Sequence, residues 1–301
     1  MSFSSYLAYF VTGYTALVLA FYMLSAVVPQ AAFVARSLAA YISLVICAIY
    51  GALASIALRI VGKEQIAQWT TARCFKYIMA LTTGVTFEVE DPNKYLDTVR
   101  PAVFIGNHQT ELDVLMLGCM FPKYCSVTAK KALKKVPFLG WFMALSGTVF
   151  IDRKNSKDAR DAMAGAASEI QRKKQSVYMF PEGTRSYAKE PTLLPFKKGA
   201  FHLAVQAGVP IVPVVVANYS HILHIKSFVF NGGKIPIKVL DPIPTTGLTP
   251  EDVDELARST RELMLSEMTA LTQKARNSNK PISMPMKAAN GASKVTGRDT
   301  S

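Results

Sequence analysis

Two long apolar runs dominate the first sixty residues. Residues 6–28 and 37–58 contain no charged side chain, and Arg36 is the only charge between them. As helices rising 1.5 Å per residue, each run would reach roughly 33 Å, against about 30 Å for the hydrocarbon core of a bilayer. Pro29-Gln30 interrupts the pattern. The sequence therefore predicts a membrane hairpin in residues 1–60, with two hydrophobic helices at about 6–28 and 37–58.

Three arrangements of this hairpin remain open: it could cross the bilayer, dip into one leaflet, or be buried as two core helices. A signal peptide fits poorly, because no basic residue precedes the apolar block and the block is too long. Basic residues gather after the second run, at Arg59, Lys63, Arg73 and Lys76, whereas the N-terminus has none. By the positive-inside tendency, the rest of the chain is expected on the cytosolic side.

Strand-like and helix-like patterns alternate from residue 101 onward. Apolar runs predict strands at 102–105, 147–151, 176–180, 211–217 and 235–240. Helices are predicted at 114–120, from Ser156 as an N-cap through the apolar stripe of residues 159–170, and after the capping pattern Thr249-Pro250. This alternation predicts an α/β domain over residues 61–273, with a mostly parallel sheet and ligand chemistry at strand ends.

The last segment, residues 274–301, is polar and has no periodicity. It contains six basic residues and one acidic residue, a balance of +5. We interpret it as a disordered basic tail.

The composition narrows the class of protein further. The chain of 301 residues carries a formal charge of +13, is 50% hydrophobic and only 18% charged, against about 25% charged residues in soluble domains. Such an excess of positive charge indicates that the partner is an anionic membrane surface, a phosphorylated substrate or nucleic acid. Nucleic acid has no further support, because basic and aromatic residues do not alternate in this sequence. The four cysteines show neither paired nor metal-type spacing, which favours a reducing, cytosol-facing compartment.

One polar cluster, Asn107-His108-Gln-Thr-Glu-Leu-Asp113, follows a predicted buried strand. Residues five apart do not share a helix face, so His108 and Asp113 can meet only if His108 lies in the turn before the helix. There a carboxylate could orient an imidazole, whose ordinary pKa is about 6.5, as a general base. The alternative is structural, with His108 capping the helix and Asp113 satisfying its N-terminus.

Two further clusters place arginines at strand ends. In Phe180-Pro-Glu-Gly-Thr-Arg185-Ser, a glycine, a hydroxyl and an arginine suit an anion site, although Pro-Glu-Gly is also an ordinary turn. Gly147-Thr-Val-Phe-Ile-Asp152-Arg153 offers a second arginine for the same phosphate, or merely an Asp–Arg surface pair.

The remaining patterns have less chemistry. Residues 209–216 (VPIVPVVV) indicate a core strand whose prolines are typical of an edge or a bulge. The basic, apolar stretch 129–141 could present solvated lysines, or could contact a membrane surface or a phosphate. The sequence has no GxSxG, P-loop, GxGxxG or HExxH pattern, so serine-hydrolase, nucleotide, dinucleotide and zinc-protease chemistry lack their usual motifs.

Taken in order, the segments NHQTELD, GTVFIDR, FPEGTRS and VPIVPV resemble the four signature blocks of the glycerophospholipid acyltransferases. The likeness is greatest to the 1-acylglycerol-3-phosphate (lysophosphatidic acid) acyltransferases of fungal and other eukaryotic type. It covers roughly residues 60–245 and the hydrophobic hairpin. The resemblance implies an acyltransferase domain of the glycerolphosphate-acyltransferase type within residues 61–273.

This resemblance implies transfer of an acyl group from acyl-CoA to the sn-2 hydroxyl of lysophosphatidic acid, giving phosphatidic acid for glycerophospholipid and triacylglycerol synthesis. Glycerol 3-phosphate, lysophosphatidylinositol or another lysophospholipid is an alternative acceptor, and a membrane lipid-binding module without catalysis is a rival from another class. The resemblance carries roles over to matching positions: His108 as base, Asp113 as its partner, Glu182, Gly183 and Arg185 with Arg153 at the acceptor phosphate, and Pro213 near the acyl chain.

The resemblance also implies partners and a location. Acyl-CoA enters as a co-substrate, with no separate cofactor and no metal, and membrane lipids surround the enzyme. The expected location is the endoplasmic reticulum membrane, or a lipid droplet, with the catalytic domain facing the cytosol.

Overall fold

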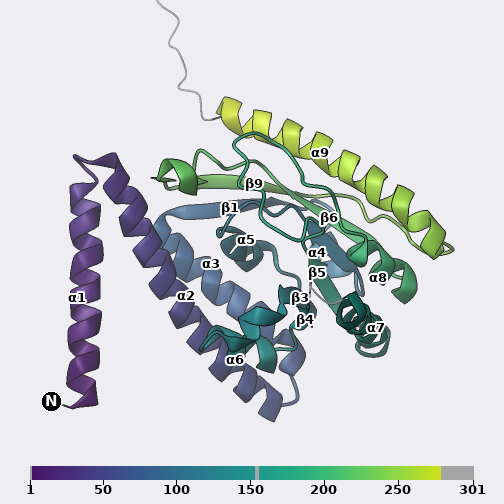
Figure 1. Cartoon of the computed structure of the whole chain (residues 1–301), viewed down its shortest axis with the longest axis horizontal. Coiled ribbons are helices and arrows are strands. Elements are labelled where there is room, and N and C mark those ends of the chain that lie inside the picture. Colours follow the sequence, from purple (N-terminus) through teal and green to yellow (C-terminus); the bar gives the residue numbers. More distant parts are fainter. Residues whose placement is uncertain (1, 153–155, 279–301) are drawn as a thin grey trace, which may run out of the picture.

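A computed structural model describes residues 2–152 and 156–278 of the chain (Figure 1). Within these residues one sheet has seven strands in the order β1-β9-β6-β2-β5-β3-β4. A separate small hairpin pairs β7 with β8. The strands are β1 (Val85–Glu90), β2 (Val103–Gly106), β3 (Cys125–Lys130), β4 (Val149–Ile151), β5 (Ser176–Met179), β6 (Ile211–Val216), β7 (Leu223–His224), β8 (Val229–Phe230) and β9 (Gly233–Val239).

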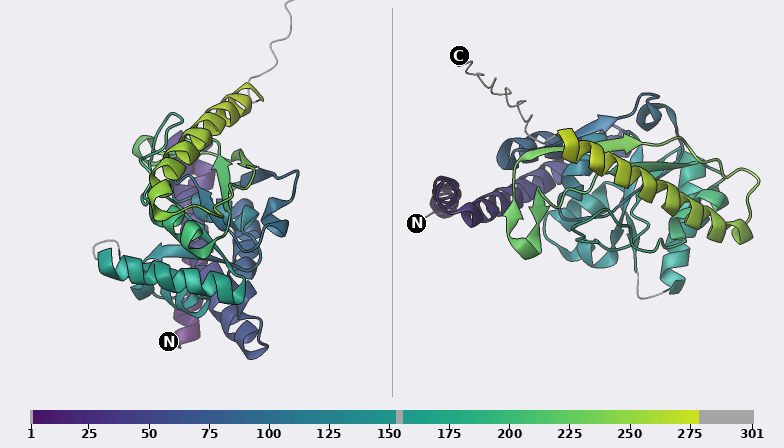
Figure 2. Two further views of the ribbon diagram at one scale, coloured as in Figure 1. Left: turned by 90° about the vertical axis from the view of Figure 1, so that its right-hand side faces the viewer. Right: turned by 90° about the horizontal axis from the view of Figure 1, so that it is seen from above.

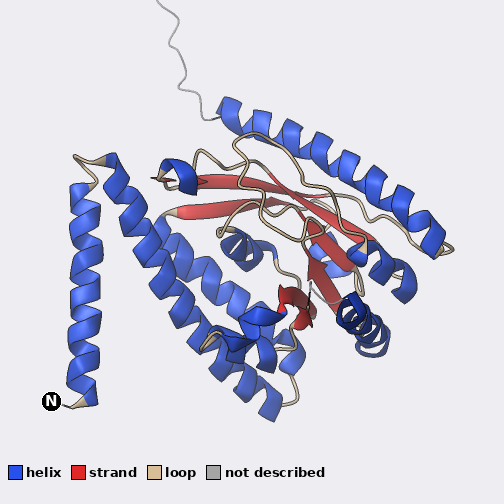
Figure 3. Ribbon diagram, in the orientation of Figure 1, coloured by secondary structure: helices blue, strands red, loops and turns tan. Residues whose placement is uncertain are grey.

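Helices surround the sheet, as Figure 3 shows in blue against the red strands. Their bounds are α1 (Phe3–Leu24), α2 (Pro29–Ile60), α3 (Ala67–Thr83), α4 (Tyr95–Thr98), α5 (Asp113–Met120), α6 (Leu139–Leu145), α7 (Ser156–Lys173), α8 (Gly199–Ala207) and α9 (Val253–Ser278). Short 3-10 turns lie at Glu64–Ile66, Lys131–Lys135, Ile225–Ser227 and Pro250–Asp252.

The sheet is mostly parallel, which confirms the predicted fold class. Only the pairing of β6 with β9 is antiparallel within it. The central strand β2 lies between β5 and β6, with Ile105 opposite both Met179 and Pro213. Because β2, β5 and β6 run in the same direction, the polar residues after each of them meet at one edge of the sheet.

Alternate strand residues supply two separate cores. Phe104 points with α2, α3 and α5 into one core, whereas Val103 and Ile105 point with α7, α8 and α9 into the other. Both faces of the sheet are therefore covered, which explains the continuous apolar strands in the sequence. The two views in Figure 2 show α9 crossing one face, on the far side of the molecule from α1 and α2.

The N-terminal hairpin forms, but its helices have different bounds from the expected ones. The first helix ends at Leu24, and the second already starts at Pro29 and includes Arg36. Pro29 begins the helix instead of breaking the run, because a first-turn residue needs no N–H donor and proline has a suitable φ. Both helices are long and apolar enough to cross a membrane. The α1 helix is not buried, so the interpretation of the hairpin as two buried core helices is wrong.

The α2 helix packs against the α/β domain along most of its length. Its buried side is made of small residues: Ala31, Ala35, Ala39, Ser43, Cys47, Ala48, Gly51 and Ser55. Arg36 fastens the start of α2, since its guanidinium donates to the carbonyls of Thr83 and Phe230 at 3.0 Å each and stacks over Tyr22. Tyr22 in turn donates to the carbonyl of Thr82. The hairpin is therefore attached to the domain at its turn.

The C-terminal helix departs from the sequence interpretation at its end. Thr249 and Asp252 form the expected capping box before α9. The helix continues to Ser278, so residues 274–278 are helical and the predicted disordered tail is wrong for these five residues. Lys274 and Arg276 reach Glu90 and Glu190, at 3.7 and 3.0 Å, which gives this last turn tertiary partners. The rest of the expected tail, residues 279–301, lies outside the described residues.

Candidate active site

The loop after β2 brings His108 and Asp113 into contact. Asn107 anchors the start of this loop, because its side-chain amide donates to the carbonyl of Val216 and its oxygen accepts that residue's N–H. His108 then lies in the turn and Asp113 is the first residue of α5. The His108 Nδ1 and Asp113 Oδ2 atoms are 2.6 Å apart. This is the contact that the sequence predicted for a histidine placed before the helix.

Asp113 is buried, with 2% of its side chain exposed, and each oxygen has partners. Oδ2 also accepts the backbone N–H groups of Gln109 and Thr110, at 2.7 and 3.2 Å. Oδ1 accepts the hydroxyl of Tyr219 at 2.7 Å. The carboxylate thus both orders the turn and holds His108, so the structural and chemical interpretations of this pair are compatible.

The His108 ring has one nitrogen available for chemistry. With Nδ1–H donated to Asp113, Nε2 carries the free lone pair. Nε2 has no hydrogen-bond partner in the part of the chain that the structure describes, and the side chain is 18% exposed. Phe180 stacks on the imidazole with ring centroids 4.1 Å apart. The ring is therefore fixed on one face and at Nδ1, while Nε2 is left to accept a proton.

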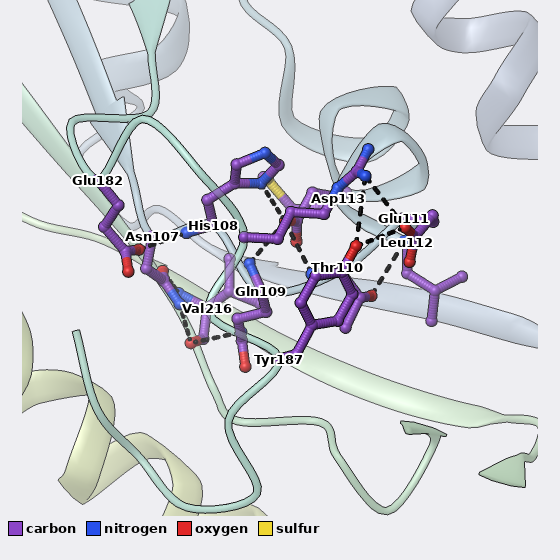
Figure 4. A network of polar contacts seen from close by, with 12 residues as sticks. Asn107, His108, Gln109, Thr110, Glu111, Leu112, Asp113, Glu182, Tyr187 and Val216 are labelled. Carbon is purple, nitrogen blue, oxygen red and sulfur yellow. Dashed lines mark hydrogen bonds and ion pairs between the residues drawn. The ribbon is translucent and has the colours of Figure 1, made fainter. Parts of the chain in front are cut away.

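The loop after β5 is fastened to the His108 turn (Figure 4). Glu182 accepts the backbone N–H of His108 at 2.7 Å through Oε1, and that of Leu194 at 2.8 Å through Oε2. Burial raises the pKa of Glu182, while these two backbone donors lower it in part. With both carboxylate oxygens used and only 3% of the residue exposed, Glu182 positions the loop, and direct contact with a phosphate does not fit this arrangement.

Gly183 gives this loop its tight turn. Its φ is +71°, a backbone conformation that favours glycine. A Cβ atom there would lie 2.9 Å from side-chain carbons of Lys197. The N–H groups of Ser186 and Tyr187 then donate to the carbonyls of His108 and Gln109, which brings the following residues to the histidine turn.

Arg185 lies beside the histidine turn with donors suited to an anion. Its Nη1 contacts Glu111 Oε1 at 3.0 Å, and the Tyr187 hydroxyl donates to the same oxygen at 2.7 Å. Burial acts to lower the pKa of Arg185, but the nearby Tyr187 and Glu111 raise it above the ordinary value, so the guanidinium stays charged. Its Nε is buried without a partner among the described residues. A buried, unpaired donor on a cation indicates a place for an anionic ligand.

The structure does not place the other two expected site residues, Arg153 and Pro213, beside His108. Arg153 lies outside the described residues; β4, which leads to it, ends at Ile151. Pro213 lies inside β6, the third of seven strands, so of the two expected positions, edge or bulge, the structure excludes the edge. Its missing N–H is tolerated because the ladder with β9 involves only Val214–Val216. Pro213 is buried in the sheet, with its carbonyl bonded to the N–H of Leu240.

Several residues of this site give no sign of their role in the sequence. Tyr219, Phe180 and Glu111 contact Asp113, His108 and Arg185 respectively, yet none belongs to a recognisable pair in the sequence. Tyr219 follows β6, and only the pairing of β6 with β2 brings it to Asp113. No group of three or more His, Cys, Asp or Glu residues suitable for a metal occurs among the described residues.

Comparisons with known proteins agree with this fold. The acyltransferase domain family matches residues 86–217, a range that includes the His108 turn, the Glu182 loop and β6. The fold and the site thus define an acyltransferase. A yeast 1-acyl-sn-glycerol-3-phosphate acyltransferase from Saccharomyces cerevisiae is 46% identical over 77% of this chain and 76% of its own length. The chain belongs to the 1-acyl-sn-glycerol-3-phosphate acyltransferase family.

Other relatives support the same assignment. The human 1-acyl-sn-glycerol-3-phosphate acyltransferase beta is 41% identical over 68% of this chain and 71% of its own length. The crystal structure of the 1-acyl-sn-glycerophosphate (LPA) acyltransferase PlsC from Thermotoga maritima has a similar fold, with a TM-score of 0.59. That likeness covers 85% of this chain and 96% of the other at 22% sequence identity.

Proposed function

We propose that this enzyme transfers an acyl group from acyl-CoA to the sn-2 hydroxyl of lysophosphatidic acid, forming phosphatidic acid. The observation that carries the proposal is the free Nε2 of a His108 held by Asp113, next to an arginine with an unpaired buried donor. A base beside an anion site suits an acceptor with both a hydroxyl and a phosphate. The names of the relatives support the same substrate.

In this reaction His108 Nε2 takes the proton of the sn-2 hydroxyl as its oxygen attacks the thioester carbonyl. The tetrahedral intermediate then expels the CoA thiolate, which receives that proton from the imidazolium, leaving the ester and free CoA thiol. Asp113 stabilises the imidazolium through its 2.6 Å contact. General-base catalysis contributes typically about 10²–10⁴-fold, and alignment of the two substrates supplies much of the rest. Because a thioester is already activated, the step needs no separate energy source.

Two residues position this base without touching substrate. Tyr219 holds the second oxygen of Asp113, which fixes the rotation of the carboxylate toward His108. Glu182 holds the backbone of His108 itself. Preorganised contacts of this kind support catalysis because the base needs no rearrangement as the reaction begins.

The acceptor phosphate binds Arg185, and Arg153 supplies a second guanidinium. Arg185 can offer its Nε and its outer nitrogens as a two-bond clamp, which a lysine cannot reproduce. Gly183 contributes through the turn that carries Arg185 to the site. Pro213 contributes only as part of the sheet under the site.

The hairpin holds the enzyme on the endoplasmic reticulum membrane, with the catalytic domain facing the cytosol. Because α2 is packed on α3 and α6, a crossing α2 would draw those elements into the bilayer, so we favour a hairpin that dips into one leaflet. A tag at the C-terminus should be digested by protease added outside intact microsomes. Protection of that tag would contradict the orientation.

An acceptor panel tests the proposed reaction. Purified enzyme receives acyl-CoA with lysophosphatidic acid, glycerol 3-phosphate, lysophosphatidylinositol or monoacylglycerol, and release of the CoA thiol is followed. The largest kcat/KM is expected with lysophosphatidic acid, and a strong loss with monoacylglycerol, which lacks the phosphate. A higher value with another acceptor would correct the substrate, and lipid binding without any thiol release would indicate a non-catalytic module.

A further inference from the structure

A basic and apolar segment lies between β3 and β4. Residues 130–145, called the interfacial segment below, include the turn Lys131–Lys135 and α6. Every residue from 131 to 138 is exposed. Large apolar side chains share this exposure, and Trp141 is the most open of them, at 56%. The four that lie outward are Leu133, Val136, Phe138 and Trp141.

The fold holds these side chains outward. Phe138 has a φ of +60°, in the left-handed region that bulky residues rarely adopt. Its ring packs edge-on against Trp141, with centroids 5.1 Å apart. Gly140 leaves no room for a side chain, because a Cβ there would lie 2.3 Å from the carbonyl oxygen of Lys134. The turn and α6 therefore form one tight unit, and a strained backbone at Phe138 is typical of a functional position.

The charge of the interfacial segment is entirely positive. Lys130, Lys131, Lys134 and Lys135 belong to it, and no acidic residue occurs between Asp113 and Asp152. Lysines beside outward aromatic and aliphatic side chains are the pattern of a surface that meets anionic lipid, where charge binds headgroups and apolar groups enter the acyl boundary.

The interfacial segment packs against the apolar hairpin. Phe142 lies against Gly51 of α2, where an added Cβ would come within 2.6 Å of the phenyl ring. This contact places α6 beside the C-terminal half of α2, as Figure 1 shows. Leu53 on that half of α2 is 63% exposed, so this half of α2 also carries outward apolar side chains, although Leu53 is about 200° of helix rotation from Gly51.

We propose that the interfacial segment is a second membrane-contact surface, which inserts Phe138 and Trp141 into the headgroup boundary of an anionic bilayer. The proposal rests on the membrane association proposed for the hairpin, and is separate from the reaction chemistry. This second contact would fix the tilt of the catalytic domain relative to the membrane. With the hairpin as the only contact, the whole enzyme could rotate about the axis of the hairpin.

Tryptophan fluorescence tests this surface directly, because the chain has only Trp69 and Trp141. The full chain carrying Trp69→Phe is reconstituted into phosphatidylcholine vesicles with or without phosphatidylglycerol, using lipids brominated on the acyl chains. We expect emission from Trp141 to shift to the blue and to be quenched by the brominated lipid, but not by iodide in the water. The double variant Lys134→Gln/Lys135→Gln should lose quenching in the anionic vesicles.

A matched control places the probe on the opposite side of the molecule. Leu263 on α9 is 43% exposed, and Leu263→Trp in a Trp69→Phe/Trp141→Phe background should respond to iodide and not to bromine. The proposal would be overturned if Trp141, like this control, is quenched by iodide and not by brominated lipid while the protein floats with the vesicles. Membrane association through the hairpin would then still hold. Protection of Trp141 that rises with protein concentration in lipid-free micelles would also overturn the proposal, in favour of a second copy of the chain.

Discussion

The carboxylate of Glu182 accepts the backbone N–H of His108 at 2.7 Å and thereby joins two motifs that are 74 residues apart. One motif carries His108, the proposed base, and the other carries Arg185 at the proposed phosphate site. Because Glu182 also holds Leu194, the same carboxylate sets the path of the chain that leads to α8. The proposed base and the proposed anion site therefore keep a fixed relation, as the proposed reaction between a hydroxyl and a thioester requires.

Glu182→Gln should impair catalysis although the side chain keeps its shape. An amide offers one acceptor oxygen, so one of the two backbone N–H groups would face an NH₂ donor, at a cost of about 1–3 kcal/mol for a buried unsatisfied group. We expect kcat to fall about tenfold or more as His108 shifts. Glu190→Gln, an exposed change whose partner is Arg276, is the control. An unchanged kcat in Glu182→Gln would show that this clamp is not needed.

Tyr219→Phe should lower kcat while leaving KM for both substrates close to the wild-type value. The variant keeps the buried ring but removes the 2.7 Å hydrogen bond to Asp113 Oδ1 and the contacts of the same hydroxyl with Thr110, at 3.1 Å to its N–H and 2.9 Å to its Oγ1. The bond to the charged Asp113 alone is worth about 1.5–3 kcal/mol, so we expect kcat to fall by about tenfold or more.

Tyr178→Phe is the matched control for that experiment. Tyr178 is equally buried, but the only hydrogen-bond partner of its hydroxyl among the described residues is the sulfur of Met116, at 3.9 Å. If both variants lose the same activity, the effect comes from packing and the positioning role of Tyr219 is wrong.

Arg185→Lys should raise KM for lysophosphatidic acid more than it lowers kcat. Lysine retains the charge but cannot make two parallel hydrogen bonds to a phosphate, so kcat/KM should fall about 10–100-fold. Turnover of monoacylglycerol, which has no phosphate, should change little. The exposed Arg258→Lys on α9 serves as control. Equal losses on both acceptors would place Arg185 outside the phosphate site.

Much of the fold was predictable from the sequence, because apolar runs and alternation report on local burial. The strands β2, β5, β6 and β9 and the helices α5, α7 and α9 lie where those patterns indicated them. The start of α2 and the end of α9 were not predictable from these patterns. Pro29 can either break or begin a helix, and the last turn of α9 has a tertiary partner through Lys274.

The site was predictable only where its residues share a motif. The contact of His108 with Asp113 follows from five-residue spacing across a turn. Tyr219 comes to Asp113 from 106 residues away through strand pairing, a relation that local pattern does not report. The sequence also did not show which groups the Glu182 side chain contacts. A carboxylate in a loop has the same sequence pattern whether it faces a ligand or a backbone amide.

Arg36→Met should destabilise the junction between hairpin and domain. It removes donors to the carbonyls of Thr83 and Phe230, and we expect a loss of about 2 kcal/mol, or a Tm lower by about 4–8 °C. Thermal unfolding in detergent micelles measures this shift. Arg59→Met, near the exposed end of the same helix, should change the stability by no more than about 0.5 kcal/mol. Matching Tm values for the two variants would refute the role of Arg36.

Loss of the base is the most direct test of the proposed chemistry. The measurement is kcat for thiol release from acyl-CoA with lysophosphatidic acid, in wild-type enzyme, in His108→Ala and in the exposed control His202→Ala. We expect His108→Ala to lose about 10²–10⁴-fold in kcat, while His202→Ala keeps the wild-type value. Turnover in His108→Ala equal to that of the control would contradict the assignment of His108 as the general base.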